Sequence, residues 1–485
     1  MHARHTTSAA IAALILSSGL GAAEPERIAI GTIDEPGFEY VHGCWEGPDG
    51  NLTGVRVLMP IDDAVLEHQM HKDAQLRGVA DNRLDIVFVG DGYTAGEQGQ
   101  FHDDAAVAIS QLFLYEPFTS YEPYFRVHEI EVVSNESGVD NDPSQGISRD
   151  TALDMSFWCG GTERLLCVNV SKAYAFASLA PDVDQVIALA NSTKYGGAGY
   201  PSSDLGTSSG GNGSSPQIAI HELGHSLGNL ADEYTYGGPT TWPGGQPGSS
   251  NASVDAASQM AAAEKKWHHW LGYTGDSRFD GPVGTYEGCN YSVFGIYRPS
   301  NNSMMRNLNR KFNAVGAERL IQSFYAEVSP IDDHTPNVHP VAPDATLSVT
   351  PMQPLDHTLD VSWTLDGTPI SGADGQTTLD LSTLGISSAA VVEATVVDNT
   401  DMVLKQSIRD NLLTQRVAWT VVTASCPADL TGDGSLNVDD VDAFVTLFIA
   451  GDLAVDFDVS GSLNVDDVDS FVAAFLAGCG GGVGL

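Results

Sequence analysis

Apolar runs and helix-period patterns alternate through the first two thirds of the chain. The run LDIVFVG at residues 84–90 has the length and β-branched character of a buried strand, and a helical pattern follows over residues 101–113. Further strands are predicted at HEIEVVS, residues 128–134, and at DQVIALANS, residues 184–192. A helix is predicted to begin near Ser215, so we expect an α/β region whose sheet precedes that helix.

Strand-period patterns flank this region on both sides. Residues 24–80 carry the short alternating runs RIAI and VRVLMP and the turn sequence GPDGN, which predict a small β-rich region. After a Pro-, His- and Asp-rich stretch, turn residues separate alternating runs such as TLDVSWTLDG and AAVVEATVVDN over residues 333–424. This spacing is typical of an Ig-like β-sandwich. The sandwich sequence has no cluster of ligand-type residues, so we predict a packing or spacing role for it.

The last predicted domain, residues 425–480, contains an internal repeat. DLTGDGSLNVDD and DFDVSGSLNVDD are each followed by a similar amphipathic helix pattern, VDAFVTLFIAG and VDSFVAAFLAG. Each loop offers oxygens at positions suited to calcium, with Gly where such a loop turns sharply. A merely soluble acidic tail needs neither that Gly nor the periodic apolar residues. The predicted calcium ligands are Asp429, Thr431, Asp433, Asn437 and Asp440 in the first loop and Asp456, Asp458, Ser460, Asn464 and Asp467 in the second.

The first residues have the pattern of a secretory signal. Within residues 1–23, Arg4 precedes an apolar run, and Gly-Ala-Ala precedes Glu24. The apolar run is too short for a membrane span, and no later segment of the sequence is long and apolar enough. We therefore expect a soluble protein that is secreted or held at the cell surface, in a compartment that permits disulfides.

Composition changes this picture mainly through charge. Asp and Glu number 63 against 22 Lys and Arg, which gives a formal net charge of −41. Such a surface repels nucleic acid and anionic lipid, so neither is an expected partner. A chain of 485 residues that is 42% hydrophobic and 18% charged is neither disordered nor fibrous, and it is long enough for several domains.

The cysteines leave several covalent arrangements open. Cys426 and Cys479 bracket the repeat and are predicted to pair. The other four allow three connectivities, of which Cys159 with Cys167 is the most local, and the sequence does not choose among them. For Cys44, a thiolate that caps a metal in a latent form is an alternative to a disulfide or a buried thiol.

The predicted helix near Ser215 carries the sequence HELGHSLGNLADEY, residues 221–234. HExxH on a helix places His221 and His225 on one face, one turn apart, where both imidazoles can bind one ion. Glu222 then lies beside a metal-bound water. Two histidines satisfied in a core are the alternative, but Ser215 as an N-cap and the following residues favour a metal site.

A catalytic zinc ion usually has a third protein ligand. Gly228 lies three residues after His225, where the chain can leave the helix and turn back toward the ion. In the metzincin pattern HExxHxxGxxH, or its Asp variant, the third ligand comes three residues after that Gly. Ala231 holds this position and has no donor atom. Asp232 is therefore the predicted third ligand, and Glu233 is the alternative.

HELGHSLGNLADEY resembles the signature of the IgA-peptidase family of zinc metallopeptidases, the igalysins, which are related to metzincins. DIVFVGDGYTAGEQGQF, EPFTSYEPYFRVHEIEVVSNESGVD, NSTKYGGAGYP and YRPSNNSMMRN resemble the same family. The resemblance implies a metzincin-like zinc endopeptidase domain at residues 81–332. It also implies a Met-turn below the metal at Ser303-Met304-Met305, with Met305 in the usual position.

The tail resembles the duplicated calcium loops of dockerins, which plug enzymes into a cohesin scaffold. This resemblance implies structural Ca²⁺ and a cohesin-like partner. Thr431 and Ser460 depart from the strongest dockerin pattern, which has a carboxylate or amide at these positions.

Together these patterns predict a multidomain α/β protein: a metzincin-like peptidase domain, an all-β Ig-like sandwich and a small α-helical dockerin-like domain. Zinc held by His221, His225 and Asp232 would activate water, with Glu222 as general base toward the peptide bonds of protein substrates. Tyr297 is a candidate helper for the oxyanion. The alternatives are a zinc hydrolase of non-peptide amides or esters, and a catalytically silent, calcium-dependent adhesion or scaffold protein.

Overall fold

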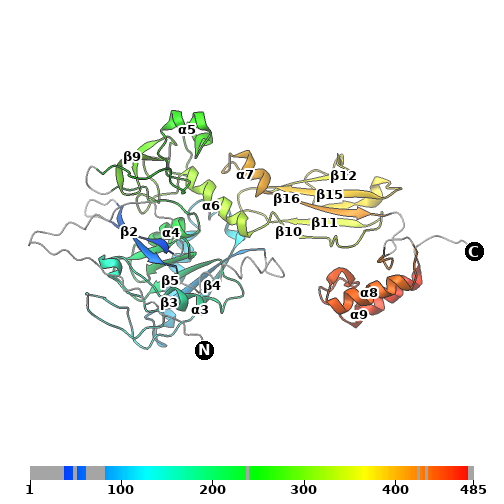
Figure 1. Ribbon diagram of the computed structural model, residues 1–485, viewed down its shortest axis with the longest axis horizontal. Coiled ribbons are helices and arrows are strands. Elements are labelled where there is room, and N and C mark those ends of the chain that lie inside the picture. The colour runs from blue at the N-terminus through cyan, green and yellow to red at the C-terminus, as the bar shows by residue number, and fades with distance from the viewer. Residues whose placement is uncertain are drawn as a thin grey trace, which may run out of the picture.

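The structure is a computed structural model and describes residues 38–46, 52–61, 82–235, 240–422, 427–431 and 435–478. The predicted signal at residues 1–23, the predicted pair Cys426 and Cys479, and the predicted calcium ligand Asp433 lie outside these residues. Figure 1 shows three successive parts of the described chain: a mixed α/β part, a part made mainly of strands, and two helices near the C-terminal end.

A seven-stranded mixed sheet, in the order β2-β1-β6-β7-β5-β3-β4, forms the centre of the α/β part. Strands β3, β4, β5 and β7 are parallel to one another, whereas β6 is antiparallel to β7. The hairpin β1–β2 extends the sheet beyond β6. The strands are β1 (Phe38–Glu46), β2 (Leu52–Pro60), β3 (Leu84–Asp91), β4 (Phe125–Ile130), β5 (Gln185–Ala190), β6 (Gly197–Tyr200) and β7 (Leu205–Ser209).

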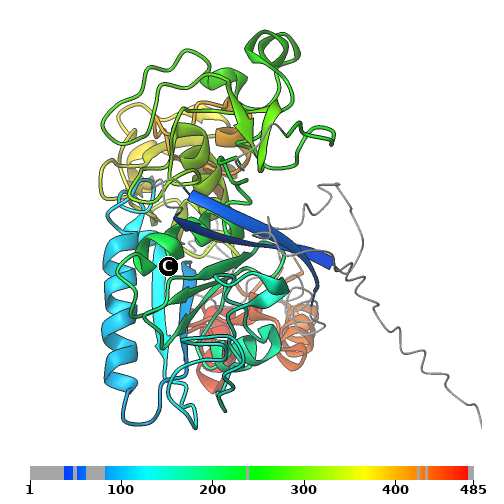
Figure 2. The same ribbon diagram turned by 90° about the vertical axis from the view of Figure 1, so that its left-hand side faces the viewer.

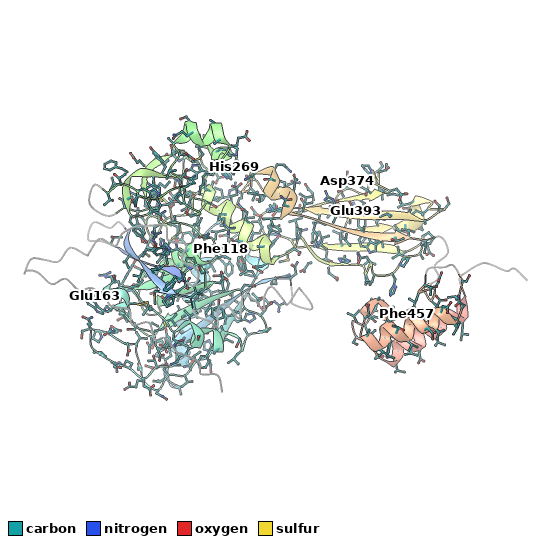
Figure 3. All side chains as sticks on the ribbon, in the orientation of Figure 1. Phe118, Glu163, His269, Asp374, Glu393 and Phe457 are labelled. Atoms are coloured by element: carbon teal, nitrogen blue, oxygen red, sulfur yellow. A yellow bond between two sulfur atoms is a disulfide. The ribbon has the colours of Figure 1, made fainter. Side chains whose placement is uncertain are left out.

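Helices cover both faces of this sheet. They bury the apolar side chains that β3 presents on both sides. Leu84 and Phe88 point into a core shared with α2 (Gln98–Leu112), α4 (Ser215–Ser226) and α6 (Ala314–Glu327). Val87 and Val89, one residue out of phase, point into a second core with α3 (Val170–Ala177). Figure 2 shows α2 in cyan beside the sheet, and Phe118, labelled in Figure 3, lies in the first core.

The segment between α4 and α6, which we call the β8–β9 lobe, contains little regular structure. Its elements are α5 (Ala257–Ala263) and the hairpin of β8 (Tyr286–Cys289) and β9 (Ser292–Arg298). Figure 1 places the lobe above α4, on the side away from β3. The chain therefore passes through α4 between the sheet and this lobe.

Two antiparallel sheets form the next part and share one core. One has the order β10-β11-β14 and the other β13-β12-β15-β16. In β15 alternate residues are buried, as the sequence pattern predicts for a sheet with one solvated face. Trp363 and Trp419 stack in this core with ring centroids 5.7 Å apart. The strands are β10 (Ile331–His334), β11 (Thr346–Pro351), β12 (Asp360–Leu365), β13 (Thr368–Pro369), β14 (Thr378–Asp380), β15 (Ala390–Val397) and β16 (Thr414–Val421).

A buried polar cluster joins these sheets to the α/β part. The Asp398 carboxylate accepts hydrogen bonds from Tyr121 at 2.6 Å, from Tyr325 at 2.7 Å and from His357 at 2.7 Å. Tyr121 precedes β4, Tyr325 is in α6, and Asp398 follows β15. The junction therefore combines groups from both parts of the chain.

The two C-terminal helices, α8 (Val438–Ala450) and α9 (Val465–Ala477), repeat one design. Asn437 and Asn464 cap them, and each cap forms a reciprocal capping box with the acid three residues later. Phe444 and Phe471 stack between the helices with centroids 4.1 Å apart, and Phe457, labelled in Figure 3, packs against both.

Most of the predicted strands and helices occur, with local shifts. The strand predicted at residues 128–134 is β4, which ends at Ile130, because its pairing with β3 begins earlier, at Phe125 and Leu84. Cys159 and Cys167 form a disulfide, whereas Cys44 and Cys289 are buried free thiols. Within the described ranges, no helix is long and apolar enough to span a bilayer.

Candidate metal centre

The helix with the HExxH motif, α4, is buried on every side. Its N-cap is Ser214 rather than the predicted Ser215, and Pro216 lies in its first turn, where the missing N–H costs no intrahelical bond. All twelve of its residues are buried between the sheet and the core around α6. The polar side chains of His221 and Glu222 therefore need partners inside the protein.

The chain leaves α4 through a tight turn at Gly228 and Asn229. A Cβ atom on Gly228 would lie 2.7 Å from the backbone oxygen of Gly224, so a larger residue does not fit without a shift. Asn229 has a left-handed conformation with φ 46°, which reverses the chain direction. After this turn Ala231 points into a small apolar cluster, and Asp232 returns to the histidines.

Three ligand-type atoms meet at one point. Oδ1 of Asp232 lies 3.2 Å from Nε2 of His221 and 3.1 Å from Nε2 of His225, and the two Nε2 atoms are 3.2 Å apart. Such separations suit three corners of a tetrahedron whose centre is about 2.0 Å from each atom, the usual distance of zinc from its ligands. The structure thus brings together the three side chains that the sequence predicted as ligands.

The hydrogen bonds of the two imidazoles orient both Nε2 atoms toward Asp232. Nδ1 of His221 donates to the backbone oxygen of Met304 at 3.0 Å, and Nδ1 of His225 donates to that of Leu230 at 2.7 Å. A neutral imidazole that donates from Nδ1 has a lone pair at Nε2. As neutral metal ligands, both rings would present a lone pair beside the Asp232 carboxylate. A cation stabilises this arrangement, so these residues fit a metal ion.

Asp232 is charged in these surroundings. Burial alone would raise the pKa of its carboxyl group, but His225, His221 and His42 together outweigh burial and hold it well below its usual range. Its second oxygen, Oδ2, accepts a hydrogen bond from the Tyr291 hydroxyl and lies 3.2 Å from Nδ1 of His42. Both carboxylate oxygens are thus used at the site.

Glu222 lies beside these atoms with one oxygen open. Its Oε1 accepts a weak hydrogen bond from the Cys44 thiol at 3.4 Å, whereas Oε2 has no hydrogen-bond partner among the described residues. Burial raises the pKa of Glu222 to about 8, partly offset by His221. A Cβ atom on Gly199 of β6 would lie 2.7 Å from Oε2, so the glycine leaves room for the carboxylate.

Glu233, the alternative third ligand, binds elsewhere. Its carboxylate accepts hydrogen bonds from Ser303 at 2.7 Å, Asn313 at 2.9 Å and Asn251 at 3.0 Å. Its backbone N–H donates to the Met305 oxygen at 2.7 Å. Glu233 therefore holds the predicted Met-turn, at a position from which it makes no described contact with the histidines.

The predicted Met-turn packs directly under α4. A Cβ atom on Gly224 would lie 2.4 Å from Sδ of Met305, which shows how closely the methionine approaches the helix between the two histidines. The neighbouring Met304 offers its backbone oxygen to His221. The turn thus supports the motif helix and also orients one of its imidazoles.

A tyrosine that the sequence did not single out, Tyr291, lies at the site. Tyr291 donates to Asp232, whereas Tyr297 in β9 pairs through its backbone with Ser253 and with Glu287 of β8. Sequence spacing gave no signal for Tyr291, which lies in a left-handed turn between β8 and β9 with φ 63°. His42 was also missed, because β1 is remote from α4 in the sequence.

The second predicted calcium loop also gathers acids. Ligand-type oxygens of Asp456, Asp458 and Asp467 lie within 4.8 Å of one another, and Asp467 also accepts from the Asp458 backbone at 3.2 Å. In the first loop, Asp440 accepts hydrogen bonds from the Thr431 backbone and hydroxyl. Asp433 of that loop lies outside the described residues.

The model of the family described as IgA peptidase M64 matches residues 74–277 and 272–324, just over half of the chain. The chain belongs to the IgA peptidase M64 family. This membership makes the protein a peptidase of a metallopeptidase family. A search of curated proteins found no match.

The matched part of this M64 chain contains the motif helix, Asp232, Tyr291 and the Met-turn. The hairpin β1–β2, which supplies His42 and Cys44, lies before it, and the two sheets with Trp363 and the tail lie after it.

Proposed function

We propose that the protein is a zinc-dependent endopeptidase of metzincin-like architecture that cleaves protein substrates. The observation that carries this proposal is the convergence of Nε2 of His221, Nε2 of His225 and Oδ1 of Asp232 next to the open oxygen of Glu222. These three side chains would hold the ion, which supplies a Lewis acid for the scissile carbonyl and acidifies water.

The remaining steps belong to the side chains of this chain. Oε2 of Glu222 takes the proton of the attacking water and then returns it to the leaving amine, which is why an oxygen without a protein partner is needed there. Tyr291 fixes the carboxylate of Asp232, and Met304 fixes the ring of His221.

The test is the substitution Glu222→Gln. It keeps the size of the side chain and removes the base, so we expect peptide cleavage to fall by about 10² to 10⁴. Bound zinc, measured by elemental analysis, is expected to stay near one ion per chain. Casein and a peptide library serve as substrates, with EDTA as control and simple esters as the comparison. Unchanged cleavage in this variant would exclude the mechanism, and hydrolysis of esters alone would favour the non-peptide alternative.

We further propose that residues 425–480 form a dockerin-like domain with structural Ca²⁺. The grouping of Asp456, Asp458 and Asp467 and the repeated capping boxes support it. The helices also expose apolar residues at matching positions of the repeat, which suits a cohesin-like protein partner. These pairs are Val438 with Val465, Val445 with Val472, and Ile449 with Leu476.

Calcium binding is tested by calorimetric titration of the full chain after treatment with a chelator. We expect Asp467→Ala to remove one binding event, because it is the last ligand of the second loop. Asp466→Ala is the matched control, since Asp466 is the exposed neighbour in the first turn of α9. Equal calcium binding in both variants would contradict the assignment.

We also propose that the protein is exported. The signal-like pattern of residues 1–23 and the disulfide between Cys159 and Cys167 support this location. N-terminal sequencing of protein recovered outside the producing cells tests it, with Glu24 as the expected first residue.

A further inference from the structure

The hairpin β1–β2 reaches into the candidate metal centre from outside the family-matched region. His42 and Cys44 are two residues apart on β1, so their side chains point to the same face of the strand. That face is turned to the site: the His42 ring stacks on His225 with centroids 4.4 Å apart, and the Cys44 thiol lies 3.4 Å from Glu222. In Figure 2 the blue hairpin runs beside the strands that lead to α4.

The backbone of β1 occupies the edge of the sheet that borders the site. Within the part of the sheet matched by the family, β6 is the edge strand, and β1 pairs with it antiparallel, His42 opposite Gly199. This pairing lies directly over Glu222, whose Oε2 would be 2.7 Å from a Cβ atom on Gly199. A free strand edge beside a peptidase site is where an extended peptide adds by main-chain hydrogen bonds.

The hairpin is closely fitted in this position. A Cβ atom on Gly43 would lie 2.2 Å from Cδ1 of Leu165 and 3.3 Å from the backbone oxygen of Gly197 in β6, so a larger residue there must displace Leu165 or move the strand. Glu39 fixes the start of β1 by accepting hydrogen bonds from the Ser202 backbone, at 2.9 Å, and from the Ser203 hydroxyl. The exposed fractions of His42 and Cys44 are only 8% and 1%.

We propose that the hairpin β1–β2 is an autoinhibitory segment. Its first strand takes the place of an extended peptide along β6, while His42 and Cys44 fill the space in front of Asp232 and Glu222. The inference rests on the proposed peptidase function. In the folded chain, a substrate reaches Glu222 only after β1 has left β6.

The test compares Gly43→Val and Glu39→Ala with the wild-type full chain. The first substitution removes the fit against Leu165, and the second removes the anchor at Ser202 and Ser203. The control is Gly96→Val, because a Cβ atom there meets nothing within 4 Å.

Two rates are measured in each protein. The first is hydrolysis of a peptide library by the zinc-loaded protein. The second is alkylation of Cys44 by iodoacetamide, with and without chelator, followed by mass spectrometry. Cys289, a second buried thiol, is the internal standard.

If the open state is a minor population, we expect both variants to raise both rates by about tenfold or more. Alkylation of Cys289 and the Gly96→Val control are expected to match the wild type. If circular dichroism shows that Gly43→Val does not fold, the inference is tested with Glu39→Ala alone.

Faster alkylation with unchanged hydrolysis would show that the hairpin covers Cys44 without inhibiting, and would overturn the inference. Equal hydrolysis in all forms, with equal alkylation of Cys44, would also overturn it and leave the proposed function standing. Absence of hydrolysis from every form, variants included, would instead overturn the proposed function.

Discussion

Asp232 and Glu233 are neighbours in the sequence, yet their carboxylates bind different groups. Asp232 meets two imidazoles and the Tyr291 hydroxyl, whereas Glu233 accepts three hydrogen bonds around Ser303. The motif spacing predicts the histidines and the base, because an α-helix fixes residues one turn apart on one face. It does not choose between the two acids, because the choice depends on the left-handed turn at Asn229.

Separate substitutions of these two acids should have different effects. We expect Asp232→Ala to lose zinc, because two neutral imidazoles alone bind it weakly. Glu233→Ala should keep near-stoichiometric zinc but lower the free energy of unfolding by about 1–3 kcal/mol, because buried donors lose their acceptor. Elemental analysis and urea unfolding measure the two effects. Zinc loss in Glu233→Ala with retention in Asp232→Ala would reverse the assignment.

Among the elements, α4 and its exit turn differ most between the burial expected from the local sequence and the burial observed. The sequence predicts this helix and its histidine face, but it gives no sign that every side of α4 is buried, because the β8–β9 lobe and α6, which complete its surroundings, come later in the chain. Strands follow their patterns closely: the continuous apolar run of β3 is buried at every residue between two layers, and the alternating run of β15 is buried at every second residue. The hairpin β1–β2 was expected only as a separate β-rich region, because strand pairing over long sequence distances leaves no local pattern.

The exit turn of α4 gives a prediction at this scale. In Gly228→Ala the new methyl group meets the Gly224 backbone oxygen, which cannot rotate away. We expect a loss of about 1–3 kcal/mol in the free energy of unfolding, together with weaker zinc binding as Leu230 moves from His225. Gly213→Ala, just before the helix and in open space, is the control and should unfold like the wild type. Chemical denaturation measures the free energy of unfolding of both variants, and titration measures their zinc binding.

For the whole molecule, the cluster around Asp398 joins the α/β part to the paired sheets. Burial disfavours the charged ring of His357, but hydrogen bonds to Asp398 and Asp356 outweigh it and raise the pKa of His357 to about 9. The donors to Asp398 come from segments that the sequence assigns to separate domains, Tyr121 and Tyr325 from one and His357 from the other. No pattern within one domain could predict this junction.

The junction predicts a pH dependence of stability. Because the pKa of His357 is raised on folding from an ordinary value of about 6.5, its contribution is complete below that pH and is lost as the pH rises through 9. The loss should reach at most about 3 kcal/mol. Thermal unfolding between pH 6 and pH 10 measures it, and His357→Gln should flatten this part of the profile. A profile that is as steep in the variant as in the wild type would exclude His357 as the cause.

The position of Cys44 also affects how the chain can be made. Ribosomes produce this thiol before Cys159 and Cys167, and long before β6 and α4, the segments that bury it. Until those segments fold, Cys44 is free to exchange with the pair that forms the native disulfide. If Cys44 pairs with Cys159 or Cys167, its thiol cannot reach Glu222, so β1 can take its place beside β6 only in a chain whose native disulfide has formed.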